Sequence, residues 1–118
     1  MKIALPIDET KTNICVSFGR TPYFMIADTE KNTFDLIENT AAEAQGGAGI
    51  KAAQIIVDQN AEVLITLRCG QNAAEIFNAA GIKIMKSEGS DAKTNVQAYL
   101  DGKLTELTHF HAGFHGIK

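Results

Sequence analysis

The sequence contains little of what nucleic-acid-binding or membrane-spanning proteins require. It has no tryptophan, and aromatic residues make up only 7% of its 118 residues. With 14 acidic and 11 basic side chains, the net charge of −3 provides neither a basic surface for nucleic acid nor a polybasic patch for a membrane. No apolar run approaches the roughly 20 residues that cross a bilayer. We therefore expect no nucleic-acid partner and no membrane association.

Cysteine is also scarce. Cys15 and Cys69 are the only two cysteines, and they form no CxxC motif. Met1 leads directly into the strand-like KIALPI, without the apolar core of a secretory signal. We expect both thiols to be reduced, in a cytoplasmic protein, rather than joined in a disulfide.

The residues that are present indicate one globular domain. Hydrophobic residues make up 45% of the chain, an ordinary balance for a protein of this size. We expect a single domain over 1–108, followed by a flexible tail, 109–118, that contains histidines. A monomer or a weak dimer is expected.

The hydrophobic periodicity predicts the order β-β-β-α-β-α-β-α. The expected strands are KIALPI, PYFMIAD, TFDLIEN, EVLITL and IKIMK, and TEKN joins the second and third in a hairpin. This order predicts an α/β fold with a mixed five-stranded sheet, in which only the second strand is reversed, covered by about three helices. It resembles the order of ribonuclease H-like folds.

The apolar spacing also predicts which helix faces are buried, and glycines and polar residues predict the helix ends. Ser90 or Asp91 is expected to cap the third helix, and Gly81 to end the second. The predicted inner faces are Ile50, Ala53, Ile56 and Val57; Ala73, Ile76, Phe77 and Ala80; and Val96, Tyr99 and Leu100.

Connections that leave parallel strands meet at one edge of a sheet, where open α/β proteins bind ligands. Here these connections are the loop 15–20, the glycine stretch 46–49, RCGQNA and SEGSD. Three helix N-termini, with their free N–H groups, would converge there. The layout therefore predicts an anion-binding cleft.

The glycine stretch leaves two interpretations open. Gly46, Gly47 and Gly49 can bring the backbone close to a ligand, or they can only allow a tight turn into a helix. They match neither GxxxxGK[ST] nor GxGxxG, so a nucleotide loop is not indicated.

Several polar residues are candidates for the same edge. Arg20 is expected to pair with an anion or to form a surface salt bridge, and Arg68 adds positive charge. Asn72 is expected to cap its helix or to orient a ligand. Cys69 begins a helix, a position that lowers the pKa of a thiol and favours metal binding, unless the residue is simply buried.

Further metal-binding candidates lie at the ends of the chain. Cys15 is a possible partner of Cys69 across the cleft, and the tail carries His109, His111 and His115, either as metal ligands or as solvated residues. Asp8 and Glu9 follow the first strand, but a nuclease would need more carboxylates and a basic surface.

Five motifs in register, MKIALPIDE, FGRTPYF, GGAGIKAAQ, CGQNAAEIFNAAGIK and AYLDGKLTEL, resemble the NifX/NafY-like family of dinitrogenase iron–molybdenum cofactor biosynthesis proteins. The resemblance covers nearly the whole chain. It implies a ribonuclease H-like domain that binds or carries a metal–sulfur cluster, such as the iron–molybdenum cofactor or an iron–sulfur cluster, and is not an enzyme. It also implies proteins that donate or accept the cluster as partners.

The resemblance assigns the family's loop arginine to Arg20 and its glycine turn to Gly46, Gly47 and Gly49. It assigns the helix start to Gly70, Asn72 and Ala73, and matches the histidine-rich end with His109, His111 and His115. A module that binds a phosphate or a nucleotide at the same edge is the alternative.

Overall fold

The computed structural model describes residues 1–110, and it confirms the predicted order of elements. His111 and His115 lie outside the described residues. The elements are β1 (Lys2–Ile7), β2 (Tyr23–Asp28), β3 (Thr33–Glu38), α1 (Ala48–Asp58), β4 (Val63–Thr66), α2 (Gln71–Ala79), β5 (Lys83–Lys86) and α3 (Ala92–Leu100).

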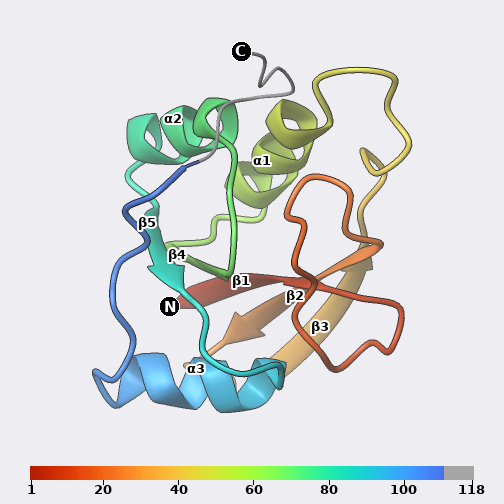
Figure 1. Cartoon of the computed structure of the whole chain (residues 1–118). Helices are drawn as coiled ribbons and strands as arrows, with labels where there is room; N and C mark the ends of the chain where they lie inside the picture. Colours follow the sequence, from red (N-terminus) through yellow and green to blue (C-terminus); the bar gives the residue numbers. More distant parts are fainter. Residues whose placement is uncertain (111–118) are drawn as a thin grey trace.

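The five strands form one mixed sheet in the order β3-β2-β1-β4-β5 (Figure 1). β2 pairs antiparallel with both β1 and β3, whereas β1, β4 and β5 are parallel. β2 is thus the only reversed strand, as predicted. The carboxyl ends of β1, β4 and β5 consequently point to the same edge of the sheet.

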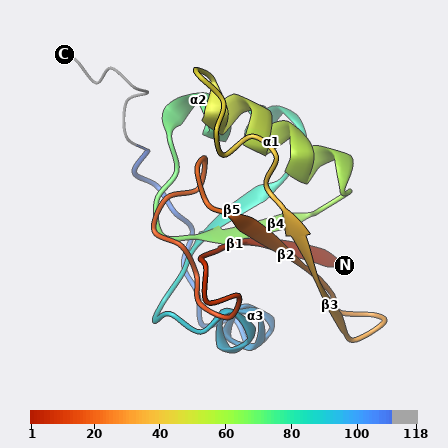
Figure 2. The same ribbon diagram turned by 90° about the vertical axis from the view of Figure 1, so that its right-hand side faces the viewer.

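The helices cover both faces of the sheet, with α1 and α2 on one side and α3 on the other (Figure 2). Alternate residues of β1 belong to two separate cores: Ala4 packs under α1 and α2, while Ile3, Leu5 and Ile7 pack with α3. β4 is buried throughout because it is covered on both faces, as its apolar sequence predicted.

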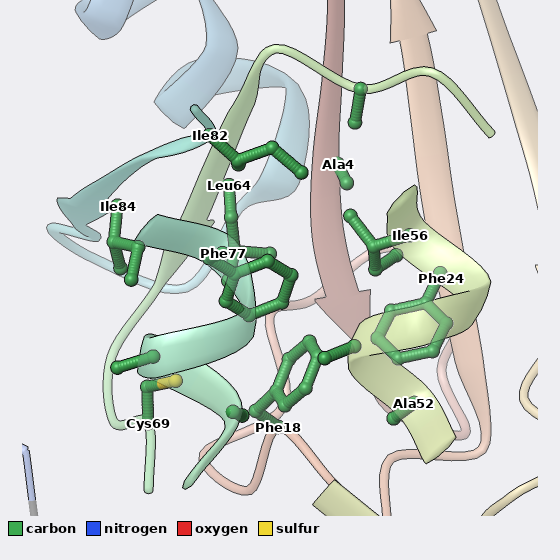
Figure 3. Packing of buried hydrophobic residues seen from close by; sticks show 14 of the residues in the cluster. Ala4, Phe18, Phe24, Ala52, Ile56, Leu64, Cys69, Phe77, Ile82 and Ile84 are labelled. Carbon is green, nitrogen blue, oxygen red and sulfur yellow. The ribbon is translucent and has the colours of Figure 1, made fainter. Parts of the chain in front are cut away.

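The core under α1 and α2 is organised by three phenylalanines (Figure 3). Phe18, from the loop after β1, lies 5.4 Å from Phe24 and 5.4 Å from Phe77, measured between ring centroids. The Phe18–Phe77 pair meets edge to face at 78°, a favourable aromatic geometry. The loop is therefore anchored to a strand and a helix through one side chain.

The predicted helix faces need correction at several positions. Ile50 is 44% exposed and Leu100 is 49% exposed, although both were expected in the core, and Ala80 is exposed as well. Small residues take the inner faces: the buried side chains are Ala48, Ala52, Ala53 and Ile56 in α1, and Ala73, Ala74 and Phe77 in α2. Small residues on the inner face suit close packing of the helices on the sheet, and the larger Ile50 lies outside that face.

The chain after α3 returns along the outer edge of β5 to the side of α1 and α2 (Figure 1). Lys86 donates its N–H to Thr105 at 2.8 Å, and Leu107 donates to Ile84 at 3.0 Å. Leu107 is buried in the core under α1 and α2, and Phe110 packs partly buried against the same cluster. This segment covers the β5 edge and brings His109 to the side of the sheet that holds α1 and α2.

None of the three helices in residues 1–110 has the length and apolar character needed to cross a membrane.

Phe77→Ala should lower the free energy of unfolding by about 3–5 kcal/mol, because Phe77 is fully buried and its truncation leaves a cavity in the core. Phe34, which is 37% exposed on β3, is the matched control, and Phe34→Ala should cost about 1 kcal/mol or less. Urea denaturation measures both. Equal losses would contradict this assignment of the core.

Candidate anion-binding pocket

A pocket of about 860 Å³ opens on the side of α1 and α2, between the loop after β1 and the starts of both helices. It is lined by segments from 16–20, 45–50 and 68–73. The structure thus brings together most of the predicted site residues, namely Arg20, Gly46, Gly47, Gly49, Arg68, Gly70 and Asn72.

The loop after β1 lies against the first turn of α1 through a contact between two glycines. A Cβ atom added to Gly19 would lie 3.1 Å from both the Cα and the N of Gly49. Only glycine at position 19 allows this approach without displacing the α1 backbone. The contact fixes the distance between the FGR loop, residues 18–20, and the N-terminus of α1. These two segments form two walls of the pocket.

The glycine stretch therefore has distinct roles at its three positions. Gly47 is the N-cap of α1 with φ +66°, a left-handed conformation that favours glycine. Gly49 makes the contact with Gly19 and faces Ala73 of α2, whereas nothing lies within 4 Å of a Cβ at Gly46. The tight-turn interpretation holds at Gly47, and the same turn exposes backbone to the pocket.

Asn39 and Thr21 hold the FGR loop in place, and sequence reasoning missed both. The buried Asn39 donates from Nδ2 to the carbonyls of Gly19 (3.0 Å) and Thr21 (2.9 Å), and its Oδ1 accepts the N–H of Ala41 (3.0 Å). The buried Thr21 hydroxyl donates to the carbonyl of Ile7 at 2.7 Å. The position of Asn39 just after the β2–β3 hairpin is typical of a turn residue. Nothing in the sequence indicated that its side chain would bond the loop after β1.

Two helices begin at the pocket without the side-chain cap that normally satisfies their first N–H groups. Within the described chain, neither Gly47 before α1 nor Gly70 before α2 receives a capping side chain, and neither first turn carries an acidic residue. Free N–H groups and the positive ends of two helix dipoles therefore point toward the same space.

The third helix does not contribute, so the prediction of three convergent N-termini is wrong. α3 begins on the opposite face of the sheet, where Asp91 accepts the N–H of Thr94 at 2.9 Å (Figure 1). The hydrogen bonds from Thr94 hold the pKa of Asp91 below its ordinary value. SEGSD is held by the buried Asn95, which bonds both the N–H and the carbonyl of Glu88. This loop does not line the pocket.

Two arginines supply full positive charges at the pocket. Arg20 donates from a guanidinium nitrogen to the carbonyl of Ala42 at 2.8 Å, which orients its planar group. This is not the predicted alternative of a surface salt bridge: over residues 1–110, the single ion pair joins the N-terminus to Glu30. Arg68 follows β4, where the buried Thr66 hydroxyl donates to its carbonyl at 3.1 Å. Within the described chain, no Asp or Glu lines the pocket.

Of the two interpretations of Cys69, the structure supports the buried residue and not the thiol of lowered pKa. Its side chain is 1% exposed and lies at the start of α2 within the phenylalanine core, not in the pocket lining (Figure 3). Burial raises the pKa of the Cys69 thiol from 9.0 to about 12, because an apolar core cannot solvate a thiolate. The rise in pKa caused by desolvation is larger than any lowering of the pKa by the nearby helix N-terminus.

The other candidates lie apart from this pocket. Cys15 is half-buried and, like Cys69, is a free thiol, as expected. His109 is exposed and lines a smaller hollow beside Arg68. Asp8 accepts the N–H of Thr10 at 2.9 Å in a surface turn. In residues 1–110 no three His, Cys, Asp or Glu side chains are grouped to hold a metal ion.

Comparison with known proteins identifies the family. The model of the family described as dinitrogenase iron-molybdenum cofactor matches residues 1–102. An uncharacterized protein of Methanocaldococcus jannaschii is 33% identical over 110 residues, which are 91% of this chain and 92% of that protein. The chain therefore belongs to the dinitrogenase iron-molybdenum cofactor family.

Solved structures show the same fold. The apo form of the orange protein from Desulfovibrio gigas superposes with a TM-score of 0.84 at 30% identity, over 91% of this chain and 92% of that one. A Thermotoga protein of the DUF35 family gives a TM-score of 0.78 at 35% identity, over 95% and 97% of the two chains. These likenesses support a mixed α/β sheet with three helices, whereas the ribonuclease H-like description stays a prediction.

Gly19→Ala should lower the free energy of unfolding by about 1–3 kcal/mol, because the new methyl group meets the backbone of α1. Gly46→Ala should change it by less than about 0.5 kcal/mol, since the space around Gly46 is open. Thermal and urea denaturation measure the stability of the two variants relative to the wild type. A Gly19→Ala protein as stable as the wild type would contradict the close contact.

Because the pKa of Cys69 is raised, the free energy of unfolding should change with pH in the alkaline range. Above pH 9 the unfolded chain loses the Cys69 proton while the folded protein keeps it, so the free energy of unfolding should fall as pH rises from about 9 to 12. Cys69→Ala should reduce this slope relative to the wild type. Urea denaturation from pH 8 to 11 measures the slopes, and equal slopes in the two proteins would contradict the prediction.

Proposed function

We propose that this protein binds an anionic metal–sulfur cluster in the pocket and carries it without altering it. The observation that carries the proposal is the meeting of two uncapped helix N-termini with Arg20 and Arg68, around a volume that no carboxylate of the described chain lines. The family description, which refers to the iron-molybdenum cofactor of dinitrogenase, supports a metal–sulfur cargo.

The chemistry of the pocket fits such a cargo. The sulfides of a cluster accept hydrogen bonds from N–H groups, and bonds of this kind tune its properties in proteins. Guanidinium groups are weakly hydrated and give up their water at low cost. Each hydrogen bond to a charged group contributes about 1.5–3 kcal/mol, so a few of them suffice for stable binding.

The pocket lining is also compatible with release of the cluster to another protein. Within the described residues it contains no cysteine, histidine, aspartate or glutamate, so the cluster would be held by charge and hydrogen bonds rather than by protein–metal bonds. Such contacts can be exchanged without breaking a coordination bond. This supports a non-catalytic carrier that serves donor or acceptor proteins of the cluster, acting in the cytoplasm.

Direct bonds to the metals remain a prediction for five residues, Cys15, Cys69, His109, His111 and His115. The Cys69 thiol would first have to leave its apolar surroundings, since burial keeps it protonated at neutral pH. His109 is better placed, because Arg68 lines both its hollow and the pocket.

Anaerobic reconstitution with iron, molybdate and sulfide tests the proposal, with metal analysis and visible absorption as readouts. The wild type should retain metal after desalting. The double variant Arg20→Gln/Arg68→Gln should retain less than about a tenth as much, because two charge-assisted contacts are lost. Lys83→Gln/Lys103→Gln removes the same number of positive charges at two exposed lysines outside the pocket lining, and this charge-matched control should bind as the wild type does.

Absence of metal in the reconstituted wild type would contradict the proposal. A thermal-shift series with inorganic phosphate and nucleotides separates it from the alternative of a phosphate-binding module. Stabilisation by nucleotides, without uptake of metal, would favour that alternative.

A further inference from the structure

Arg20 is an exposed residue whose side chain is nevertheless restrained. Its guanidinium donates to the carbonyl of Ala42 at 2.8 Å, and this bond orients the planar group at the pocket. The bond uses one of the five N–H donors of a guanidinium, so the group can bind an anion without releasing the carbonyl. An arginine that is already ordered also loses less conformational entropy on binding than a free one does.

The backbone on either side of Arg20 is fixed by the buried side chain of Asn39. Its Nδ2 donates to the carbonyl of Gly19 at 3.0 Å and to the carbonyl of Thr21 at 2.9 Å. These are the residues directly before and after Arg20 in the chain. An amide nitrogen carries two N–H groups, and Asn39 uses both of them to hold the backbone that carries the arginine.

The carbonyl that receives the guanidinium is fixed by Asn39 as well. Its Oδ1 accepts the N–H of Ala41 at 3.0 Å, and its backbone carbonyl accepts the N–H of Ala42 at 3.2 Å. A closed ring of hydrogen bonds therefore runs from Asn39 through the backbone of 19–21 to the Arg20 guanidinium, and returns through 41–42. One buried side chain sets both the position of the arginine and the group that orients it.

We propose that Asn39 is a positioning residue of the pocket, which holds the Arg20 guanidinium in the orientation that binds the anionic cluster. Without Asn39 the arginine is ordered only when the cluster binds, and the cluster is released faster. This effect on release is separate from the contribution of Asn39 to stability. The inference rests on the proposed function, because it takes Arg20 to contact the cluster.

A second buried asparagine has the same pattern of bonds and lies away from the pocket. Asn95 of α3 donates from Nδ2 to the carbonyls of Glu88 and Asp91, both at 2.9 Å, and its Oδ1 accepts the N–H of Glu88 at 2.8 Å. It is 1% exposed, and α3 covers the opposite face of the sheet (Figure 2). Asn95 is therefore a matched control for the structural part of the role of Asn39.

Asn39→Ser and Asn95→Ser are compared with the wild type after anaerobic reconstitution with iron, molybdate and sulfide. Serine is neutral, and its short side chain cannot bond all three partners of the asparagine. Visible absorption follows release of the cluster after an excess of EDTA is added, and urea denaturation of the unloaded proteins measures their stability. Both variants should lose stability, but only Asn39→Ser should release the cluster faster, by about three- to tenfold.

A double-mutant cycle determines whether Asn39 acts through Arg20. Arg20→Gln should release the cluster faster than the wild type does, and the addition of Asn39→Ser should change that rate by less than about twofold. Where Asn39→Ser does not fold, Asn39→Thr replaces it, since threonine is also neutral and fills more of the space. Where Arg20→Gln takes up no metal, the comparison of Asn39→Ser with Asn95→Ser decides.

Each outcome has a definite meaning. Wild type that takes up metal, together with an Asn39→Ser protein that releases it no faster than Asn95→Ser does, overturns the inference and leaves the proposed function standing. Equal acceleration with and without Arg20 also overturns it, because Asn39 then acts on the fold as a whole. The same holds if neither variant of Asn39 folds. Wild type that takes up no metal overturns the proposed function and this inference with it.

Discussion

The contact between the backbones of Gly19 and Gly49 is the constraint on which the pocket depends. It places the loop after β1 directly against the first turn of α1, so closely that a Cβ atom at position 19 would lie 3.1 Å from the α1 backbone. Phe18 anchors the loop in the core on one side, and Asn39 and Thr21 fix its backbone on the other. Arg20 is thereby held at the pocket by a loop that cannot move away without opening the core.

The helices on the two faces of the sheet begin in different ways. α3, across the sheet, begins with an aspartate whose carboxylate satisfies the backbone N–H of Thr94. α1 and α2 begin with glycines, and no side chain in residues 1–110 caps them. Leaving such groups free costs stability, which makes sense where a ligand completes their hydrogen bonds. The pocket is therefore positive because of what its helices lack as well as because of its arginines.

Local signals in the sequence predicted the order of the elements, the reversed β2, the left-handed Gly81 after α2 and a cap of α3 at Ser90 or Asp91, of which the structure uses Asp91. Each of these features depends on residues close together in the chain. They left the environment of Cys69 open and failed for Ile50. Proximity to a helix N-terminus suggested a reactive thiol, but whether the side chain points to the pocket or to the core depends on how α2 packs on Phe18 and Phe77. Similarly, Ile50 is exposed because the face of α1 that packs on the sheet consists of Ala48, Ala52, Ala53 and Ile56.

The sequence by itself determined the α/β class, the strand directions and the edge of the sheet at which a site would form, because periodicity, hairpin length and the chain reversals between parallel strands require no knowledge of distant contacts. Only the tertiary structure decided which of the connections between strands and helices meet at the pocket. It assigned SEGSD to the opposite face, buried the Cys69 thiol, and recruited Asn39 from a turn 20 residues beyond Gly19. These outcomes depend on packing between segments far apart in the chain, and no local pattern records them.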